Sequence, residues 1–207
     1  MDLTLILSFI GAAVLLTIMP GPDNLFVLAQ SITQNKKAGI ATSLGLCSGL
    51  LVHISAAAIG ISALLYQSSF AFTVVKLFGA GYLLFMAYEA LKERNKTSTL
   101  KEQPSRTYLA LYRKGIFMNI LNPKVSLFFL ALLPQFINHE SGSPALQMLL
   151  LGLIFIIQAL IIFFLISIYA GKLAKYITGN STLLRRFNLT KAGLLTLIGI
   201  QIALSKN

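Results

Sequence analysis

Two short segments of the sequence combine helix-breaking residues with ionisable or amide side chains. One is PGPDN at residues 20–24, the other is NILNPK at residues 119–124, and each interrupts an apolar run. Proline lacks an N–H donor and disrupts the preceding helical turn, and glycine adopts backbone angles that other residues avoid. Unpaired backbone groups are costly in hydrocarbon, so such a segment persists only where it lines protein or a polar cavity. The two segments are therefore candidates for a ligand site.

Asp23 and Lys124 are the ionisable residues of these segments. An ionisable side chain inside a membrane span indicates a functional site by default. Asp23 could pair with a substrate ammonium, carry a coupling proton, or do both in turn. The alternative is that Asp23 or Asn24 only caps the half-helix that follows Pro22. Lys124 could hold a substrate carboxylate or pair with Asp23, and snorkelling to the membrane surface is its alternative.

Amide side chains accompany both charges. Asn119 and Asn122 can either orient a ligand or bond the backbone groups that a break leaves free. The free N–H groups at the start of the half-helix after Pro22 form a positive dipole end that suits a carboxylate. The candidate substrate-binding residues are Pro20, Gly21, Pro22, Asp23, Asn24, Asn119, Asn122, Pro123 and Lys124.

One helix face between the two segments carries small residues and a histidine. Ala41, Gly45, Gly49 and His53 recur at intervals of four residues. The glycines form a stripe that lets another helix approach closely, either within one chain or across a homodimer interface. His53 could relay coupling protons together with Asp23. The alternative is a histidine that packs and hydrogen-bonds within the protein.

The elements that carry these residues are membrane helices. Hydrophobic residues make up 56% of the 207 residues and charged residues 11%, and the mean hydropathy is +0.79. Soluble domains carry about 25% charged residues. The net charge of +11 is spread over short segments between apolar runs, which excludes a nucleic-acid-binding module. Because Cys47 is the one cysteine, we expect no disulfide and no cysteine-based metal site. We also expect no cofactor.

A membrane-spanning helix needs about 20 consecutive apolar residues. The sequence predicts six spans, the last of them short: Leu3–Ala29, Ile40–Tyr66, Phe70–Leu91, Gly115–Phe136, Pro144–Ala170 and Leu189–Leu204. The predicted fold class is an all-α integral membrane protein with six transmembrane helices, of which spans one and four are broken.

Lysine and arginine are distributed unequally between the loops. The loops after spans one, three and five contain lysine, and those after spans three and five also contain arginine, whereas the loops after spans two and four contain neither. Basic loops stay in the cytoplasm. We therefore expect a multi-pass protein of the cell (plasma or inner) membrane with its N- and C-termini outside.

Three spans in each half make the halves cross the membrane in opposite directions. The halves, about 1–91 and 113–207, are joined by the basic cytoplasmic loop 92–112 in a single transporter domain, 1–207. In both halves the first span is the broken one, and each break lies roughly 10–15 Å from the cytoplasmic surface at about 1.5 Å rise per residue. Paired interruptions in corresponding spans point to a midplane substrate site. The sequence therefore predicts an inverted repeat whose breaks face each other.

Three motifs resemble the LysE/RhtB family of amino-acid exporters, whose members include homoserine, threonine and leucine efflux translocators. They are MPGPDNLFVL in span one, VKLFGAGYLLFMAYEAL in span three and GIFMNILNPKVSLFFLALLPQF across span four. The resemblance covers the whole chain and implies a secondary carrier that exports amino acids, driven by the proton gradient. It also implies that residues 20–22 are the family's signature break and residues 122–124 its partner.

The expected substrate is a neutral amino acid. Asp23 and Lys124 suit a zwitterion, and no further intramembrane acid is placed to bind a cationic side chain. The expected partners are this small molecule, protons and the lipid bilayer. A metal-ion exporter of the same architecture and an intramembrane enzyme are the alternatives. Cation sites usually need clustered carboxylates, thiolates or imidazoles, and enzymes need an acid–base pair or a nucleophile constellation.

Overall fold

The computed structural model describes residues 2–19, 21–61, 69–92, 105–138, 142–179 and 181–204. These residues form helices and short connections and contain no strand, which confirms the all-helical prediction for them. The helices are α1 (Leu3–Ile18), α2 (Pro22–Thr33), α3 (Lys36–Ala56), the π-helix η1 (Ala57–Ile61), α5 (Ser69–Lys92), α6 (Tyr108–Ile120), α7 (Pro123–Leu127), the π-helix η2 (Phe128–Leu132), the 3₁₀ helix η3 (Leu133–Phe136), α8 (Pro144–Ile168), α9 (Ala170–Gly179) and α10 (Ser181–Leu204).

Two pairs of consecutive helices are bent at the predicted breaks. The axis turns by 55° between α1 and α2 and by 48° between α6 and the helical segment that starts at Pro123. In the described residues, two uninterrupted helices are long and apolar enough to cross a membrane, and each bent pair can count as one further span. The described residues thus support a helical membrane protein with two to four such spans, and the prediction of six spans is not confirmed.

Several helix ends differ from the predicted span ends. The fourth span was expected from Gly115, but α6 begins at Tyr108, where the Thr107 side chain accepts a hydrogen bond from Ala110 N. The sixth was expected from Leu189, but α10 begins at Ser181. Hydropathy marks the hydrocarbon-facing part of a helix, and a helix continues into the polar layer wherever its caps allow. The amphipathic α9 was not predicted at all.

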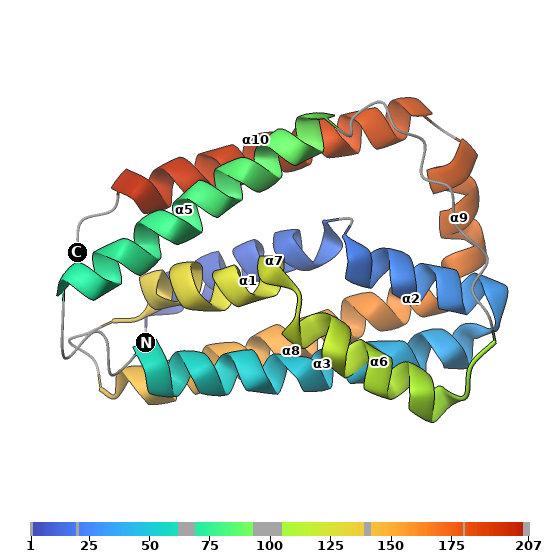
Figure 1. The fold of residues 1–207 in the computed structure, drawn as a ribbon, viewed down its shortest axis with the longest axis horizontal. Coiled ribbons are helices and arrows are strands. Elements are labelled where there is room, and N and C mark those ends of the chain that lie inside the picture. The colour runs from blue at the N-terminus through green and yellow to red at the C-terminus, as the bar shows by residue number, and fades with distance from the viewer. Residues whose placement is uncertain are drawn as a thin grey trace.

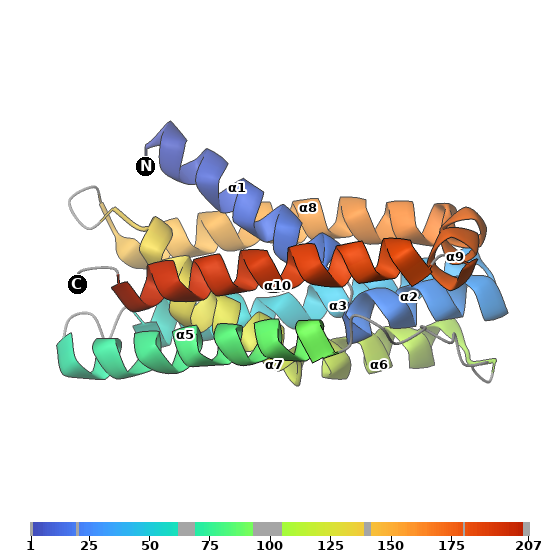
Figure 2. The same ribbon diagram turned by 90° about the horizontal axis from the view of Figure 1, so that it is seen from above.

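Helix α3 is the centre of the packing. It contacts α6, α8 and α2, while α5 and α10 lie side by side as a separate pair that touches η2 (Figures 1 and 2). A Cβ on Gly45 would overlap the backbone of Tyr112 in α6, and one on Gly115 would lie 2.6 Å from Thr42 O in α3. The glycine stripe is therefore a contact within the chain and gives no support to a homodimer interface.

Two sets of contacts define one end of the molecule. At this end, Gln34 Nε2 donates to Arg106 O at 2.9 Å and Arg106 N donates to Gln34 Oε1 at 3.2 Å. Gly39 lies against the hydroxyls of Ser31 and Ser167. The C-terminal ends of α2 and α8 therefore lie beside the N-terminal ends of α3 and α6, with α9 against the ends of α2 and α8 (Figure 1).

Candidate functional site

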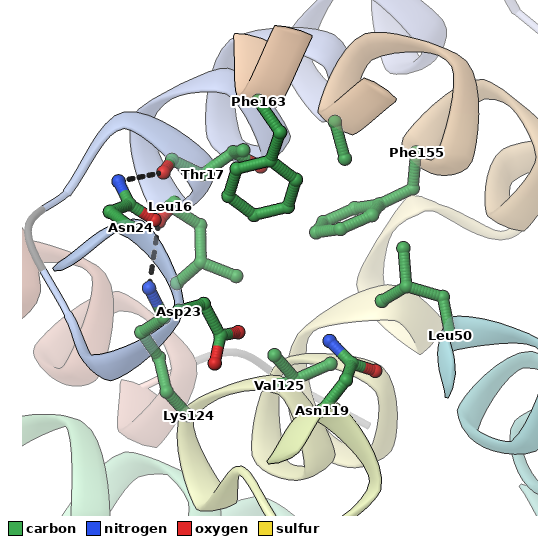
Figure 3. Close-up of a pocket in the computed structure, with 11 residues that line it drawn as sticks. Leu16, Thr17, Asp23, Asn24, Leu50, Asn119, Lys124, Val125, Phe155 and Phe163 are labelled. Atoms are coloured by element: carbon green, nitrogen blue, oxygen red, sulfur yellow. Dashed lines mark hydrogen bonds between the residues drawn. The ribbon is translucent and has the colours of Figure 1, made fainter. Parts of the chain in front are cut away.

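The two helix breaks contact each other. Asn122 Nδ2 donates a hydrogen bond of 2.8 Å to Asp23 Oδ2, and Lys124 Nζ donates one of 3.1 Å to the carbonyl oxygen of Leu16 near the end of α1. The close-up shows Asp23 and Asn119 beside one another, with Phe155 and Phe163 across the space from them (Figure 3). The expectation that the breaks face each other is confirmed by these bonds.

The two breaks follow the same local pattern. In each, a capping residue is followed by an exposed proline at the first helical position and a buried ionisable residue at the second. Proline suits the first position because its fixed φ matches the helix and its missing N–H would be unpaired there anyway. The corresponding residues are Gly21 and Asn122, Pro22 and Pro123, and Asp23 and Lys124.

Asp23 does not cap α2. The N-cap residue is Gly21, and no side chain bonds the N–H groups of that helix end. The Asp23 side chain is 3% exposed, and its Oδ1 has no hydrogen-bond partner. The capping alternative for Asp23 is therefore wrong, and one oxygen of a buried carboxylate has no hydrogen-bond partner among the residues that the structure describes.

Asn24 bonds the backbone that the first break leaves free. Its Nδ2 donates to the carbonyl oxygens of Thr17, Ile18 and Met19 at 2.8, 3.2 and 3.3 Å. These three acceptors fix the orientation of the amide, because only its nitrogen can donate. Asn24 Oδ1 is buried and has no partner. Asn24 therefore satisfies carbonyl groups at the helix break through its Nδ2, while its Oδ1 remains available as an acceptor.

Lys124 is buried rather than snorkelling. Its side chain is 7% exposed, and its ammonium lies at the carbonyl end of α1, where the helix dipole favours a cation. A Cβ on Gly21 would lie 3.2 Å from Lys124 Nζ. Glycine at position 21 therefore leaves the space that the ammonium approaches.

Between the breaks lies a small cavity with a volume of about 20 Å³. Four predicted site residues line it, namely Asp23, Asn24, Asn119 and Lys124. Its remaining lining residues were not predicted: Leu16, Thr17, Leu50, Val125, Phe155, Ala159 and Phe163.

These apolar lining residues gave no signal in the sequence. Phe155, Ala159 and Phe163 recur every four residues on α8, but α8 is apolar on every side, so no face of it stands out. Thr17 precedes the first break directly, and its hydroxyl accepts a 2.9 Å bond from Gln158 Nε2. The polar side chain of Thr17, one turn before the break, was the one sequence feature that could have indicated a lining residue.

His53 lies behind the cavity. Its Nε2 is 3.0 Å from Asn119 O, and since a carbonyl can only accept, Nε2 carries the hydrogen. The ring stacks on Phe129 with centroids 6.0 Å apart. His53 thus bonds a carbonyl next to the second break and contacts the site through Asn119.

The remaining predicted site residues lie at the edge of the site or outside the described part. Pro22 and Pro123 are exposed and shape the breaks without lining the cavity. Pro20 lies outside the described residues. Among the residues that the structure describes, no three His, Cys, Asp or Glu side chains cluster as a metal site would require.

Comparison with known proteins places the chain in a family. The sequence matches LysE type translocator over residues 14–206. An uncharacterized membrane protein of Bacillus subtilis (strain 168), YrhP, is 30% identical over 97% of this chain and 99% of the relative.

Two further relatives are similarly distant. An uncharacterized membrane protein of Vibrio cholerae is 30% identical over 89% of this chain and 90% of the relative. The homoserine/homoserine lactone efflux protein of Salmonella typhimurium (strain LT2) is 28% identical over 97% of this chain and 96% of the relative. No solved structure matches. Because the family match spans nearly the whole chain and includes both helix breaks, this membrane protein belongs to the LysE type translocator family.

Proposed function

We propose that the protein is a secondary transporter that exports small neutral amino acids from the cytoplasm, with the cavity between the two breaks as its substrate site. The observation that carries this proposal is the convergence of Asp23, Asn24, Asn119 and Lys124 on one cavity from two broken helices. Membership of a translocator family and a relative named as an efflux protein for homoserine and its lactone support it.

The polar atoms of the cavity suit an ammonium group. Asp23 Oδ1, Asn24 Oδ1 and Asn119 Oδ1 are buried and without hydrogen-bond partners, and all three are acceptors. A primary ammonium carries three N–H donors and no acceptor. Leaving such oxygens unpaired costs free energy, so binding an ammonium there would recover it.

The rest of the cavity suits a carboxylate and an uncharged side chain. Among the described lining residues Lys124 is the cation, and it can meet a substrate carboxylate once that group enters. Leu50, Phe155 and Phe163 form an apolar wall. A charged side chain would lose its hydration against this wall without gaining a partner, so the site selects neutral amino acids.

In this conformation the cavity is smaller than an amino acid. A volume of about 20 Å³ holds about one water molecule, far less than an amino acid needs. Transport therefore requires the helices to separate first towards one side of the membrane and then towards the other, as the halves of inverted-repeat carriers do.

The proposed architecture has six spans in two inverted halves, with α5 and α10 as the third and sixth. Both have 24 residues, about 36 Å at 1.5 Å per residue, which exceeds a hydrocarbon core of about 30 Å. The basic loops place the end at which α2 meets α3 in the cytoplasm and both termini outside.

We propose that the proton gradient drives export, with Asp23 as the proton-binding group. A buried carboxylate that faces a cavity can exchange its substrate ammonium for a proton, so that its own negative charge is compensated in both states. His53 supports this exchange through its bond to Asn119.

Efflux from proteoliposomes tests the proposed function. Vesicles are loaded with a panel of labelled amino acids that includes homoserine, and efflux is followed with and without an imposed pH gradient. Export of neutral members that accelerates under the gradient is expected. If no member leaves faster than from protein-free vesicles, the amino-acid proposal fails; if efflux ignores the gradient, only proton coupling fails.

The described residues give no support to the two alternatives, a metal-ion exporter and an intramembrane enzyme. The described residues contain no cluster of metal-binding side chains, and the cavity pairs one carboxylate with amides and a lysine rather than with a second acid or an activated nucleophile.

A further inference from the structure

Gln30 is a buried polar side chain that the proposed substrate site does not use. It is 0% exposed, and among the described residues neither its Nε2 nor its Oε1 has a hydrogen-bond partner. An unpaired buried amide costs free energy, and such groups are rare enough in native proteins to need an explanation.

The spacing along α2 places Gln30 on the cavity-facing side of the helix, closer to its C-terminal end than the substrate site. Gln30 follows Asp23 by seven residues, and Ser31 follows Asn24 by seven. Seven residues are close to two helical turns, so each pair shares a face, and the second member lies about 10 Å farther along the helix. Because Asp23 and Asn24 line the cavity, Gln30 and Ser31 lie on the same side of α2, towards the end proposed as cytoplasmic.

Helices α8 and α3 complete this region. Ser167 lies one turn beyond Phe163, which lines the cavity. A Cβ on Gly39 would overlap Ser31 Oγ and lie 2.8 Å from Ser167 Oγ. The three helices therefore meet at two hydroxyl groups and a glycine.

These hydroxyls can serve a passing substrate. Ser31 Oγ donates to Val27 O at 2.7 Å and Ser167 Oγ donates to Phe163 O at 2.9 Å. A hydroxyl that donates in this way still has lone pairs that accept an N–H. The amide of Gln30 adds a donor and an acceptor, so together the three side chains can replace hydration of an ammonium and a carboxylate.

The opposite side of the cavity has a different lining. Rings of Phe9, Phe128, Phe136 and Phe155 pack there, with centroid separations between 5.1 and 6.5 Å. Phe155 also lines the cavity, so this aromatic cluster forms its wall towards the N-terminal ends of α1 and α8. Polar groups thus lie on one side of the site and packed rings on the other.

We propose that Gln30, Ser31 and Ser167 line the route by which the substrate reaches the cavity from the cytoplasm, closed in this conformation by contact of α2, α3 and α8. The proposal rests on the proposed function, because it takes the cavity as the substrate site and this end of the molecule as cytoplasmic.

Thiol labelling tests whether the route opens. The variants Ser31→Cys and Ser167→Cys are made in a Cys47→Ser background, which removes the one native cysteine. Thr42→Cys is the matched control, since Thr42 is equally buried and donates to Ala38 O, but lies at the α3–α6 contact. A membrane-impermeant methanethiosulfonate is added to inverted membrane vesicles, which expose the cytoplasmic side, and to intact cells.

Labelling of Ser31→Cys and Ser167→Cys in inverted vesicles but not in cells, with Thr42→Cys unlabelled, is the expected result. The route is overturned if neither serine variant is labelled from the cytoplasmic side, or if Thr42→Cys reacts equally fast. Labelling needs no transport, whereas the proposed function stands or falls on efflux by the unmodified protein, so the two failures are distinguishable.

A comparison of two buried glutamines, Gln30 and Gln147, tests the role of Gln30. Gln147 is 4% exposed, and both of its amide atoms bond the backbone of Asn138, at 3.0 and 2.8 Å. Gln147→Leu should therefore lower the melting temperature of the purified protein. Gln30→Leu should leave or raise it, while lowering kcat/KM for efflux about fivefold, the loss expected for one hydrogen bond.

The result that overturns the proposal is a Gln30→Leu protein that melts lower and exports at the wild-type rate per folded molecule. Gln30 would then have a structural role only. Gln30→Asn, which keeps an amide, should retain more of the efflux rate than Gln30→Leu.

Discussion

Asp23 and Asn24 are neighbours in the chain with different tasks in the structure. Asn24 donates to three carbonyls at the end of α1 and so makes the first break tolerable in an apolar setting. Asp23 bonds Asn122 across the site and keeps Oδ1 for the cavity. Asn24 maintains the geometry of the break, and Asp23 supplies the charge that we propose binds the substrate.

The first prediction concerns Asp23→Asn, which keeps the shape of the side chain and removes its charge. Substrate affinity should fall about 10- to 100-fold, since a hydrogen bond to a charged group contributes about 1.5–3 kcal/mol. The remaining efflux should no longer respond to the pH gradient. Efflux from proteoliposomes at several pH values measures both. Glu89→Gln, at an exposed carboxylate on α5, is the control. An unchanged pH profile would mean that Asp23 does not carry the coupling proton and only accepts the hydrogen bond from Asn122.

The second prediction concerns Lys124→Met, which keeps the length of the side chain. The apparent affinity for the amino acid should weaken about tenfold, because a bond to one charged group is lost, while membrane insertion is retained. Lys114→Met is the control. Lys114 Nζ lies 4.5 Å from the centroid of the Phe26 ring, and Lys114 does not line the cavity. Dose-dependent efflux measures the affinity. A wild-type value in Lys124→Met would separate this lysine from substrate binding.

At the scale of helices, the sequence predicted where spans break but not what they pack against. Proline, glycine and an ionisable residue disrupt a helix through local chemistry, so residues 20–24 and 119–124 could be recognised directly. The small residues Gly45 and Gly49 indicate close helix approach, but a glycine does not specify its partner. That partner is α6, which meets Gly45 at Tyr112 and Gly49 at Ile116 and Asn119. Its position depends on the arrangement of the whole bundle.

The third prediction tests this helix contact. Gly115→Val should destabilise the protein by about 1–3 kcal/mol, the usual cost of overpacking, because a Cβ there meets backbone atoms of α3 rather than movable side chains. Gly81→Val is the control, since nothing lies within 4 Å of a Cβ at that position. Thermal unfolding in detergent compares them. Equal melting temperatures would mean that α3 and α6 do not approach this closely.

At the scale of the whole molecule, the site exists because folding brings the two breaks into contact. Asp23 and Asn122 are 99 residues apart and share a hydrogen bond. The sequence predicted this meeting from the matching position of the breaks in the two halves. It could not predict the apolar wall of the cavity, because α8 is apolar on all faces and its orientation follows from contacts with α1, α2 and α3.

The most direct test of the central claim, that the cavity between the breaks binds the amino acid, uses a fluorescent reporter. The chain contains no tryptophan, so Phe163→Trp places a single indole in the cavity wall. Phe78→Trp, at a position 75% exposed on α5, is the control. Titration with a transported neutral amino acid should change the emission of Phe163→Trp saturably and leave Phe78→Trp unchanged. A Phe163→Trp protein that still exports the amino acid, but whose emission does not change on titration, would contradict the claim.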